Sequence, residues 1–252
     1  ERVLSEEEAD VIILNTCTVK GATENREFER IRKLVAGKTV LEAEYRKPET
    51  GNPEPETGNR KPETGNPKLV IAGCLTANAS KIRKFAPLAP LVGTSSLRHV
   101  NDAIDDAIAG RATYYDASER KDGLPKLLTA PICRIPINDG CVSSCHFCQT
   151  RLARPFLRSY SPKTIVKWIN EGVKAGAREF QLTSQDSGAY GMDIKTSLSA
   201  LLDAIAGDNS PGRVDAEFLV RLGMINPEHA KRMLPDLIRA LSGPRFYKFL
   251  HV

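Results

Sequence analysis

The hydrophobic and polar positions of the first hundred residues follow two periods in turn. Two short apolar runs rich in β-branched residues, VIILN and LVIAG, are typical of strands buried within a parallel sheet. They occupy 11–15 and 69–73, and PLVGT at 90–94 is a candidate third strand. Between them, apolar residues fall three or four apart, as on the buried face of a helix. The helical positions are Phe28, Ile31 and Leu34/Val35 over 22–36, and then Val100, Ile104 and Ile108. This alternation predicts helices packed on a parallel sheet.

The second half of the chain resumes the alternation after a charged linker around 116–126. Strands are predicted at RIPI, at 179–183, at 217–222 and at the final FYKFLHV. Ser161 and Pro162 are a typical N-cap and first residue for a helix over 162–175, which Gly176 ends. Its expected inward positions are Ile165, Trp168, Ile169 and Val173. Two further helices are expected, one carrying Leu198, Leu201, Leu202 and Ile205 and the other over 228–241.

Domain organisation follows from these two series. The fold class is α/β: an N-terminal parallel-sheet domain over 1–115, followed by part of a β/α barrel over 128–252. Between the first helix and the second strand, PETGN recurs three times with a period of seven. Because Pro and Gly in each unit forbid a continuous helix and nothing apolar lies between the units, 46–68 is expected to be a disordered surface insertion without a catalytic role.

Composition excludes several classes of protein. Of the 252 residues, 41% are apolar and 27% charged, which is typical of a globular protein rather than a disordered or fibrous one. No apolar run approaches the roughly 18 residues that cross a bilayer, so we expect a cytoplasmic protein without a membrane partner. The chain opens with Glu1 and stops inside an apolar run, and we expect it to be a fragment. The net charge of +5 identifies no partner. The stretch 151–167, however, carries basic residues and no acidic one. Such a stretch can attract phosphate, and an ordinary solvated surface is at least as common an explanation.

Three of the six cysteines form one motif, Cys-x-x-x-Cys-x-x-Cys, at Cys141, Cys145 and Cys148. Thiolates are the ligands of iron–sulfur clusters, and three on a short loop leave one iron of a four-iron cluster open to a small molecule. Two alternatives remain open. A zinc ion could recruit His146 or Cys133 as a fourth ligand, although zinc sites usually come as paired Cys-x-x-Cys knuckles. Buried cysteines could also cluster by chance.

The remaining cysteines divide into two kinds. Cys17 and Cys74 each follow a predicted buried strand at its carboxyl end, and those ends share one edge in a parallel sheet. A shared metal or redox site is about as well supported there as two ordinary buried cysteines. Cys133 lies within a predicted strand, and we interpret it as a core residue.

Polar residues follow the later strands on the expected rim of the barrel. Gln185, Asp186 and Tyr190 come after the strand at 179–183, and Arg221 ends the EFLVR run. Such groups suit the amino, carboxylate and hydroxyl groups of a ligand. Taken one at a time, turn chemistry for Asp-Ser-Gly and a surface ion pair for the arginine are the better explanations.

Together, these blocks resemble a known family. INDGCVSSCHFCQTRLAR resembles the cluster loop of radical S-adenosylmethionine enzymes, including the aromatic Phe147 before the third cysteine. DVIILNTCTVK, LVIAGCLTAN, LTSQDSGAYGMD, VRLGMINP and FYKFLHV resemble the methylthiotransferases, and the last three are most similar to the archaeal and eukaryotic branch that acts on N6-threonylcarbamoyladenosine in tRNA. The resemblance covers nearly the whole chain apart from the PETGN insertion.

The resemblance implies two 4Fe–4S clusters and S-adenosylmethionine as cofactors. The radical cluster maps onto Cys141, Cys145 and Cys148, and the second cluster would use Cys17 and Cys74 with a third cysteine that belongs upstream of Glu1. Phe147, Gln185, Asp186, Tyr190 and Arg221 become expected contacts of S-adenosylmethionine. The family's later barrel strands and its C-terminal RNA-binding module would lie beyond Val252.

The implied reaction removes hydrogen from C2 of the modified adenine beside the anticodon and adds a methylthio group there. Its partners are tRNA, S-adenosylmethionine, an electron donor and a sulfur donor. Arg154 and Arg158 in the basic stretch are expected to contact RNA phosphates. Two alternatives are kept: a sister enzyme acting on isopentenyladenosine in tRNA or on a ribosomal-protein aspartate, and a non-catalytic zinc-bound RNA-binding module.

Overall fold

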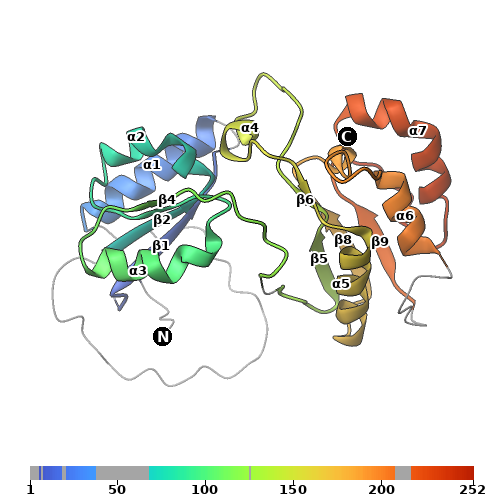
Figure 1. Cartoon of the computed structure of the whole chain (residues 1–252), viewed down its shortest axis with the longest axis horizontal. Helices are drawn as coiled ribbons and strands as arrows, with labels where there is room; N and C mark the ends of the chain where they lie inside the picture. Colours follow the sequence, from blue (N-terminus) through green and yellow to red (C-terminus); the bar gives the residue numbers. More distant parts are fainter. Residues whose placement is uncertain (1–5, 7, 19–20, 38–67, 125, 208–216) are drawn as a thin grey trace. The chain divides into compact units, whose positions relative to one another are not determined.

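The computed structural model describes residues 6, 8–18, 21–37, 68–124, 126–207 and 217–252. The chain forms two compact units, Glu1–Glu119 and Arg120–Val252, each with its own core (Figure 1). Most of the predicted PETGN insertion, 46–67, lies outside the described residues, and Lys68 begins a strand. No helix among the described residues is long and apolar enough to cross a membrane.

The first unit is a four-stranded parallel sheet with helices on both faces. Its strands pair in the order β1 (Val11–Thr16), β2 (Lys68–Gly73), β3 (Leu91–Val92) and β4 (Tyr114–Tyr115). The helices are α1 (Gly21–Val35), α2 (Ala79–Arg83) and α3 (Val100–Ile108), with short 3-10 turns at Cys74–Asn78 and Leu97–His99. Residues of α1 and α2 pack on one face of the sheet, and Ala103 and Ala107 of α3 pack on the other. The predicted parallel α/β arrangement of this unit is confirmed.

The apolar residues that marked the helices of this unit differ in burial. Phe28, Ile31 and Leu34 are buried, whereas Val35 is 46% exposed and Ile108 is 61% exposed. In helix α3 the buried apolar residues are the alanines Ala103 and Ala107, and not the larger Ile108. Small side chains let a short helix lie close to the sheet, and an apolar residue at a helix end carries no requirement to be buried.

The second unit contains a three-stranded parallel sheet in the order β5 (Ile132–Pro136), β8 (Glu179–Thr183) and β9 (Leu219–Leu222). A small antiparallel pair, β6 (Asn138–Asp139) and β7 (Arg158–Ser159), lies on either side of the cysteine loop in the sequence. The helices are α4 (Thr150–Ala153), α5 (Pro162–Lys174), α6 (Leu198–Ala206) and α7 (Pro227–Leu241), with a 3-10 turn at Ser187–Ala189. Ser161 caps α5 by accepting a hydrogen bond from the Thr164 amide, and Pro162 begins it, as predicted.

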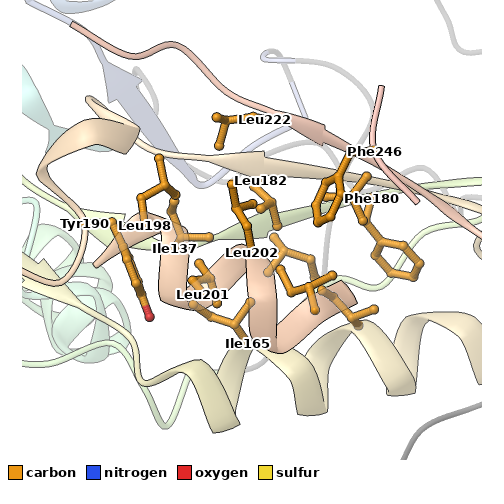
Figure 2. Close-up of a cluster of buried hydrophobic side chains, with 14 of the residues drawn as sticks. Ile137, Ile165, Phe180, Leu182, Tyr190, Leu198, Leu201, Leu202, Leu222 and Phe246 are labelled. Carbon is orange, nitrogen blue, oxygen red and sulfur yellow. The ribbon is translucent and has the colours of Figure 1, made fainter. Parts of the chain in front are cut away.

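The core of this unit lies between the sheet and its helices (Figure 2). Phe180, Leu182 and Leu222 from the strands meet Leu201 and Leu202 from α6, and all five are fully buried or nearly so. The alternate strand residues lie on the opposite face. On that face, the register aligns Arg134, Gln181 and Arg221 in one row across β5, β8 and β9. The sheet therefore has an apolar face towards the helices and a polar face away from them.

The end of the chain differs from the prediction. FYKFLHV was expected to form a strand, but only one parallel bridge, between Val220 and Phe246, is present. Single hydrogen bonds from Tyr247 to Val220 and from Ile225 to His251 hold the segment beside β9. Residues Ser242–Phe246 form turns. The backbone that follows therefore bonds to the neighbouring strand at separate residues, and it does not form the continuous hydrogen-bond ladder of a strand. The sheet is parallel α/β, as predicted, and has three strands rather than four.

Asp106 of α3 links that helix to the edge strand of the first unit, and we expect it to make the stability of this unit dependent on pH. Hydrogen bonds from Thr113 and Tyr115, together with Arg111, hold the pKa of this buried carboxyl at about 2 instead of 3.8. A pKa lowered on folding stabilises the folded state above the unfolded value, and that stabilisation is lost as the pH falls through the folded value. Replacing Asp106 by Asn should therefore lower the urea midpoint at pH 7, and the difference from wild type should shrink between pH 3.8 and about 2.

The exposed neighbour Asp105 provides the matched control, because Asp105→Asn changes the same charge on the same helix. This control should leave the urea midpoint close to that of wild type over the whole range. A midpoint difference for Asp106→Asn that stays constant with pH would contradict the assigned role of Asp106.

Candidate functional site

The cysteine loop begins at a position where only glycine fits. Gly140 has φ of +85°, and a Cβ there would lie 2.1 Å from the carbonyl oxygen of Phe156. Its amide donates a 2.8 Å hydrogen bond to Oε1 of Gln185, at the carboxyl end of β8. The loop therefore starts at the carboxyl edge of the parallel sheet, where the barrel prediction placed it.

The three thiols of Cys141, Cys145 and Cys148 are each half-buried on this loop. A turn closes the second half of the motif, with the amide of Cys148 donating to the carbonyl of Cys145 at 3.1 Å. Burial raises the pKa of the Cys141 thiol above its ordinary value. Within the described ranges, however, no three or more Cys, His, Asp or Glu side chains lie close enough together to hold a metal ion.

The donor chemistry of the loop nevertheless fits an iron–sulfur cluster. Three soft thiol ligands come from one short segment, and each remains partly accessible. In β6 and in the turn after β8, Oδ1 of Asn138 and Oγ of Ser187 are buried, and neither has a hydrogen-bond partner in the described structure. Buried polar atoms without a partner are uncommon, and they are consistent with a polar site that receives a further group.

Asp186 has a different place from the one predicted. It is 1% exposed, and its carboxylate accepts hydrogen bonds from the amides of Gly188 (2.9 Å) and Asn226 (3.0 Å) and from Nδ1 of His229 (2.7 Å). The hydroxyl of Ser143 lies 3.2 Å from the same carboxylate and 2.9 Å from Oε1 of Glu228, so the two carboxylates share its single hydrogen. These bonds use both carboxylate oxygens, so Asp186 is committed to the protein and is not an accessible ligand contact. It joins the cysteine loop, the turn after β8 and the start of α7.

Tyr190 is likewise interior. Its side chain is 1% exposed within the apolar core, and its hydroxyl donates a 2.8 Å hydrogen bond to the carbonyl of Tyr160 (Figure 2). Burial raises the pKa of this phenol. The expected ligand contact at Tyr190 is therefore corrected to a core role. The motif that predicted it identified the right segment, but a sequence pattern does not say which side of a turn faces inward.

The other predicted cofactor contacts are accessible or partly so. Phe147 is 74% exposed at the tip of the loop, and Gln185 is half-buried with its oxygen bound to the loop amide. Arg221 is exposed on the polar face of the sheet, with its guanidinium 5.1 Å from the ring centre of Phe249. Arg134, which the sequence did not single out, lies in the same row across the strands.

Of the two predicted phosphate contacts, Arg154 is held by the protein. Its guanidinium pairs with Asp139, which also binds Lys121. Burial opposes ionisation of this carboxyl, but the two cations outweigh that cost and lower the pKa of Asp139. Arg154 is therefore part of an ion pair within the protein, whereas the sequence led us to expect a cation that binds phosphate. Arg158 is half-buried, with its guanidinium 5.7 Å from the ring centre of Phe156.

In the first unit, Cys17 and Cys74 both follow the last matched pair of two parallel strands. Thr16 of β1 aligns with Gly73 of β2, so the two cysteines occupy equivalent positions just beyond the sheet. Gly73 has φ of +96°, and a Cβ there would lie 2.5 Å from the carbonyl oxygen of Thr16. The hydroxyl of Thr16 in turn donates a 2.7 Å bond to the carbonyl of Ala72. Both cysteines are half-buried at one sheet edge, and that placement is what the prediction of a shared site required.

Three residues that support the loop were missed by sequence reasoning: Ser143, Asn226 and His229. The Asn-Pro pair at 226–227 was a usable signal for the start of a helix. The contact of Asn226 with the loop could not be found from the sequence, because Asn226 lies 81 residues from the cysteine that it touches. His229 is 3% exposed, and buried histidines carry no distinctive spacing in the sequence.

Replacing Asp186 by Asn tests the assignment of Asp186 as a structural centre. The variant keeps the shape of the side chain but replaces one carboxylate oxygen by an NH2 group. An NH2 group cannot accept a hydrogen bond, so buried donors such as Ser143 and His229 lose their acceptor. We expect a loss of about 2–4 kcal/mol in the free energy of unfolding, measured in urea. The control is Asp203→Asn, which removes an exposed ion pair with Arg239 and should cost at most about 0.5 kcal/mol. Equal effects of the two substitutions would contradict the assignment.

Known proteins resemble this chain along its whole length. No protein-family model matches it. It is 36% identical over 98% of its length to the probable threonylcarbamoyladenosine tRNA methylthiotransferase of Archaeoglobus fulgidus, 51% of which is covered. It is 31% identical over its full length to the protein of that name from Pyrococcus horikoshii (52% covered), and 30% identical over 97% to the threonylcarbamoyladenosine tRNA methylthiotransferase of Danio rerio (40% covered). The chain spans about half the length of the curated archaeal relatives that it matches. The similarity to these archaeal and animal methylthiotransferases therefore extends over nearly the whole of this chain and over about half of each archaeal relative.

Proposed function

We propose that this chain is the cluster-binding part of an enzyme that adds a methylthio group to C2 of N6-threonylcarbamoyladenosine beside the anticodon of tRNA. The observation that carries the proposal is the loop of three thiols at the carboxyl edge of a parallel sheet, in a chain whose relatives carry that activity in their names. The substrate is a tRNA, and we place the reaction in the cytoplasm. The proposed chemistry is that of radical S-adenosylmethionine enzymes.

The thiol groups of this chain would hold two kinds of cluster. Cys141, Cys145 and Cys148 would bind a 4Fe–4S cluster through three irons, which leaves one iron for S-adenosylmethionine. Cys17 and Cys74 would provide two ligands of a second cluster. When bound, these cofactors supply the electron transfer and the sulfur chemistry, with an electron donor and a sulfur donor as further partners.

The protein's own side chains position the small-molecule ligand and the loop. Arg221 is exposed on the polar sheet face and suits a carboxylate, and Phe147 offers an accessible aromatic surface beside the third cysteine. Gln185 fixes the start of the loop through Gly140. Asp186 and Tyr190 act from the interior by holding the segment that carries Gln185.

Anaerobic reconstitution with iron and sulfide tests the cluster directly. We expect about four irons per chain at the three-thiol loop, in addition to any iron at the N-terminal cysteines, and cleavage of S-adenosylmethionine to 5′-deoxyadenosine when a reductant is added. Cys145→Ala should abolish the cleavage and remove the loop's share of the iron. Cys133→Ala is the matched control: this cysteine is buried in the core of the second unit, so its loss should change neither iron nor cleavage.

Other results would favour other functions. Zinc instead of iron, with no cleavage of S-adenosylmethionine, would favour a zinc-bound RNA-binding module and contradict the enzyme. A methylthio group found on isopentenyladenosine or on a ribosomal-protein aspartate, by mass spectrometry of products, would contradict the proposed substrate while leaving the cofactors in place.

The basic stretch after the loop is the proposed site of contact with tRNA phosphates. Because Arg154 is paired with Asp139, the better tests are the exposed Arg151 and the half-buried Arg158. Each change to Ala should weaken tRNA binding and reduce the slope of log affinity against log salt by about 0.7–0.9, since one phosphate contact is lost. Lys231→Ala, which removes an exposed cation on α7, should leave that slope unchanged. Equal slopes for all three variants would contradict the proposed contact.

A further inference from the structure

Asn226 joins three elements through three different atoms. It follows β9 and caps α7, where its side-chain oxygen accepts a 3.2 Å hydrogen bond from the amide of Glu228. Its backbone amide donates a 3.0 Å bond to Oδ1 of Asp186. Its side-chain nitrogen lies 3.4 Å from Sγ of Cys145, in the middle of the cysteine loop.

The cap determines which end of the side chain faces the sulfur. A carboxamide has an oxygen that accepts and a nitrogen that donates, and the two are the separate in-plane branches of the same carbon. Because the oxygen of Asn226 is used by the helix, the nitrogen is directed towards Cys145. The buried carboxylate of Asp186 fixes the backbone of Asn226, and His229 on the first turn of α7 fixes Asp186 in turn. The donor is therefore held in place before any ligand binds.

This contact differs from the polar contacts that loop thiols make with residues close in sequence. Cys141 is hydrogen-bonded by Ser143, and the hydroxyl of Thr150 lies 3.0 Å from Sγ of Cys148, so each of these partners is only two residues away. Asn226 comes from the sheet and helix scaffold, 81 residues away from Cys145. It can therefore anchor the loop to the scaffold, which a neighbour within the loop cannot do.

We propose that Asn226 is a positioning residue that donates a hydrogen bond to the thiolate of Cys145 and thereby raises the reduction potential of a cluster bound there. This inference rests on the proposed function. Reduction adds an electron to the cluster and its thiolates, and a donor at one sulfur stabilises that added negative charge. The same bond anchors the middle cysteine of the motif to the end of β9.

Two substitutions separate the donor from the helix cap. Asn226→Ser retains a capping oxygen and removes the amide donor, while Asn226→Asp retains the cap, removes the donor and adds a negative charge. With the 252-residue chain reconstituted anaerobically, the midpoint potential of the cluster is measured by redox titration followed by electron paramagnetic resonance. We expect a more negative potential in Asn226→Ser and a still more negative one in Asn226→Asp.

The control variant removes a helix cap elsewhere in the same unit. Ser161 caps α5 through Thr164, and Ser161→Ala should lower the thermal unfolding midpoint without changing the potential. Asn226→Ser should show the opposite pattern, with a shifted potential and an unfolding midpoint near that of wild type. If Asn226→Asp does not fold, Asn226→Ser decides alone, because it carries no charge.

The two ways to fail are distinguishable. A wild-type chain that binds its cluster, with potentials in both Asn226 variants equal to the wild-type value, would overturn this inference and leave the proposed function intact. A wild-type chain that binds no iron–sulfur cluster at all would overturn the proposed function, and the role of Asn226 with it.

Discussion

The buried carboxylate of Asp186 is the interaction on which the geometry of the second unit depends. A carboxylate taken out of water is tolerated only when its lone pairs are filled, and here two backbone amides and an imidazole donate to it, with a hydroxyl shared with Glu228. These contacts join three segments: the cysteine loop through Ser143, the turn after β8 through Gly188, and the start of α7 through Asn226 and His229. The hydrogen bonds offset the cost of burying the charge, and they hold the three segments together.

Much of the fold could be predicted because it depends on local periods. Ser161, Pro162 and the apolar spacing that follows specify α5 almost residue by residue, and the cores on both sides of β2 follow from its continuous apolar run. The errors occur where a distant neighbour decides. Ile108 has helical spacing, but α3 packs Ala103 and Ala107 on the sheet and leaves Ile108 exposed at its end. FYKFLHV has strand composition, yet among the described residues its backbone partners outside the preceding turn are Val220 and Ile225.

The site shows the same division. The position of the three thiols at the carboxyl edge of the sheet follows from spacing and chain topology, so the place of the loop could be derived from the sequence. The roles of the surrounding polar residues could not, because they depend on burial. Asp186, which follows β8, is interior, whereas Arg221, which lies within β9, is exposed, although both are polar residues of the quoted motifs. A charge such as Arg154 gives no sign in the sequence of whether its partner is a phosphate or, as here, the carboxylate of Asp139.

The polar face of the second sheet gives the final step of this argument. Arg134, Gln181 and Arg221 stand in one row, with Glu179 one pleat away bonded by Gln181 and Tyr247. Bonds from these two residues lower the pKa of Glu179 and keep it charged. This sheet face therefore carries two guanidinium groups and a carboxylate that is fixed by hydrogen bonds, so it is unsuited to an apolar partner. The thiol loop starts at the carboxyl edge of the same sheet, where the amide of Gly140 binds Gln185 just after β8. A charged sheet face and a thiol-bearing loop thus belong to one scaffold, and the alternation of side chains along the strands is what separates that face from the apolar core.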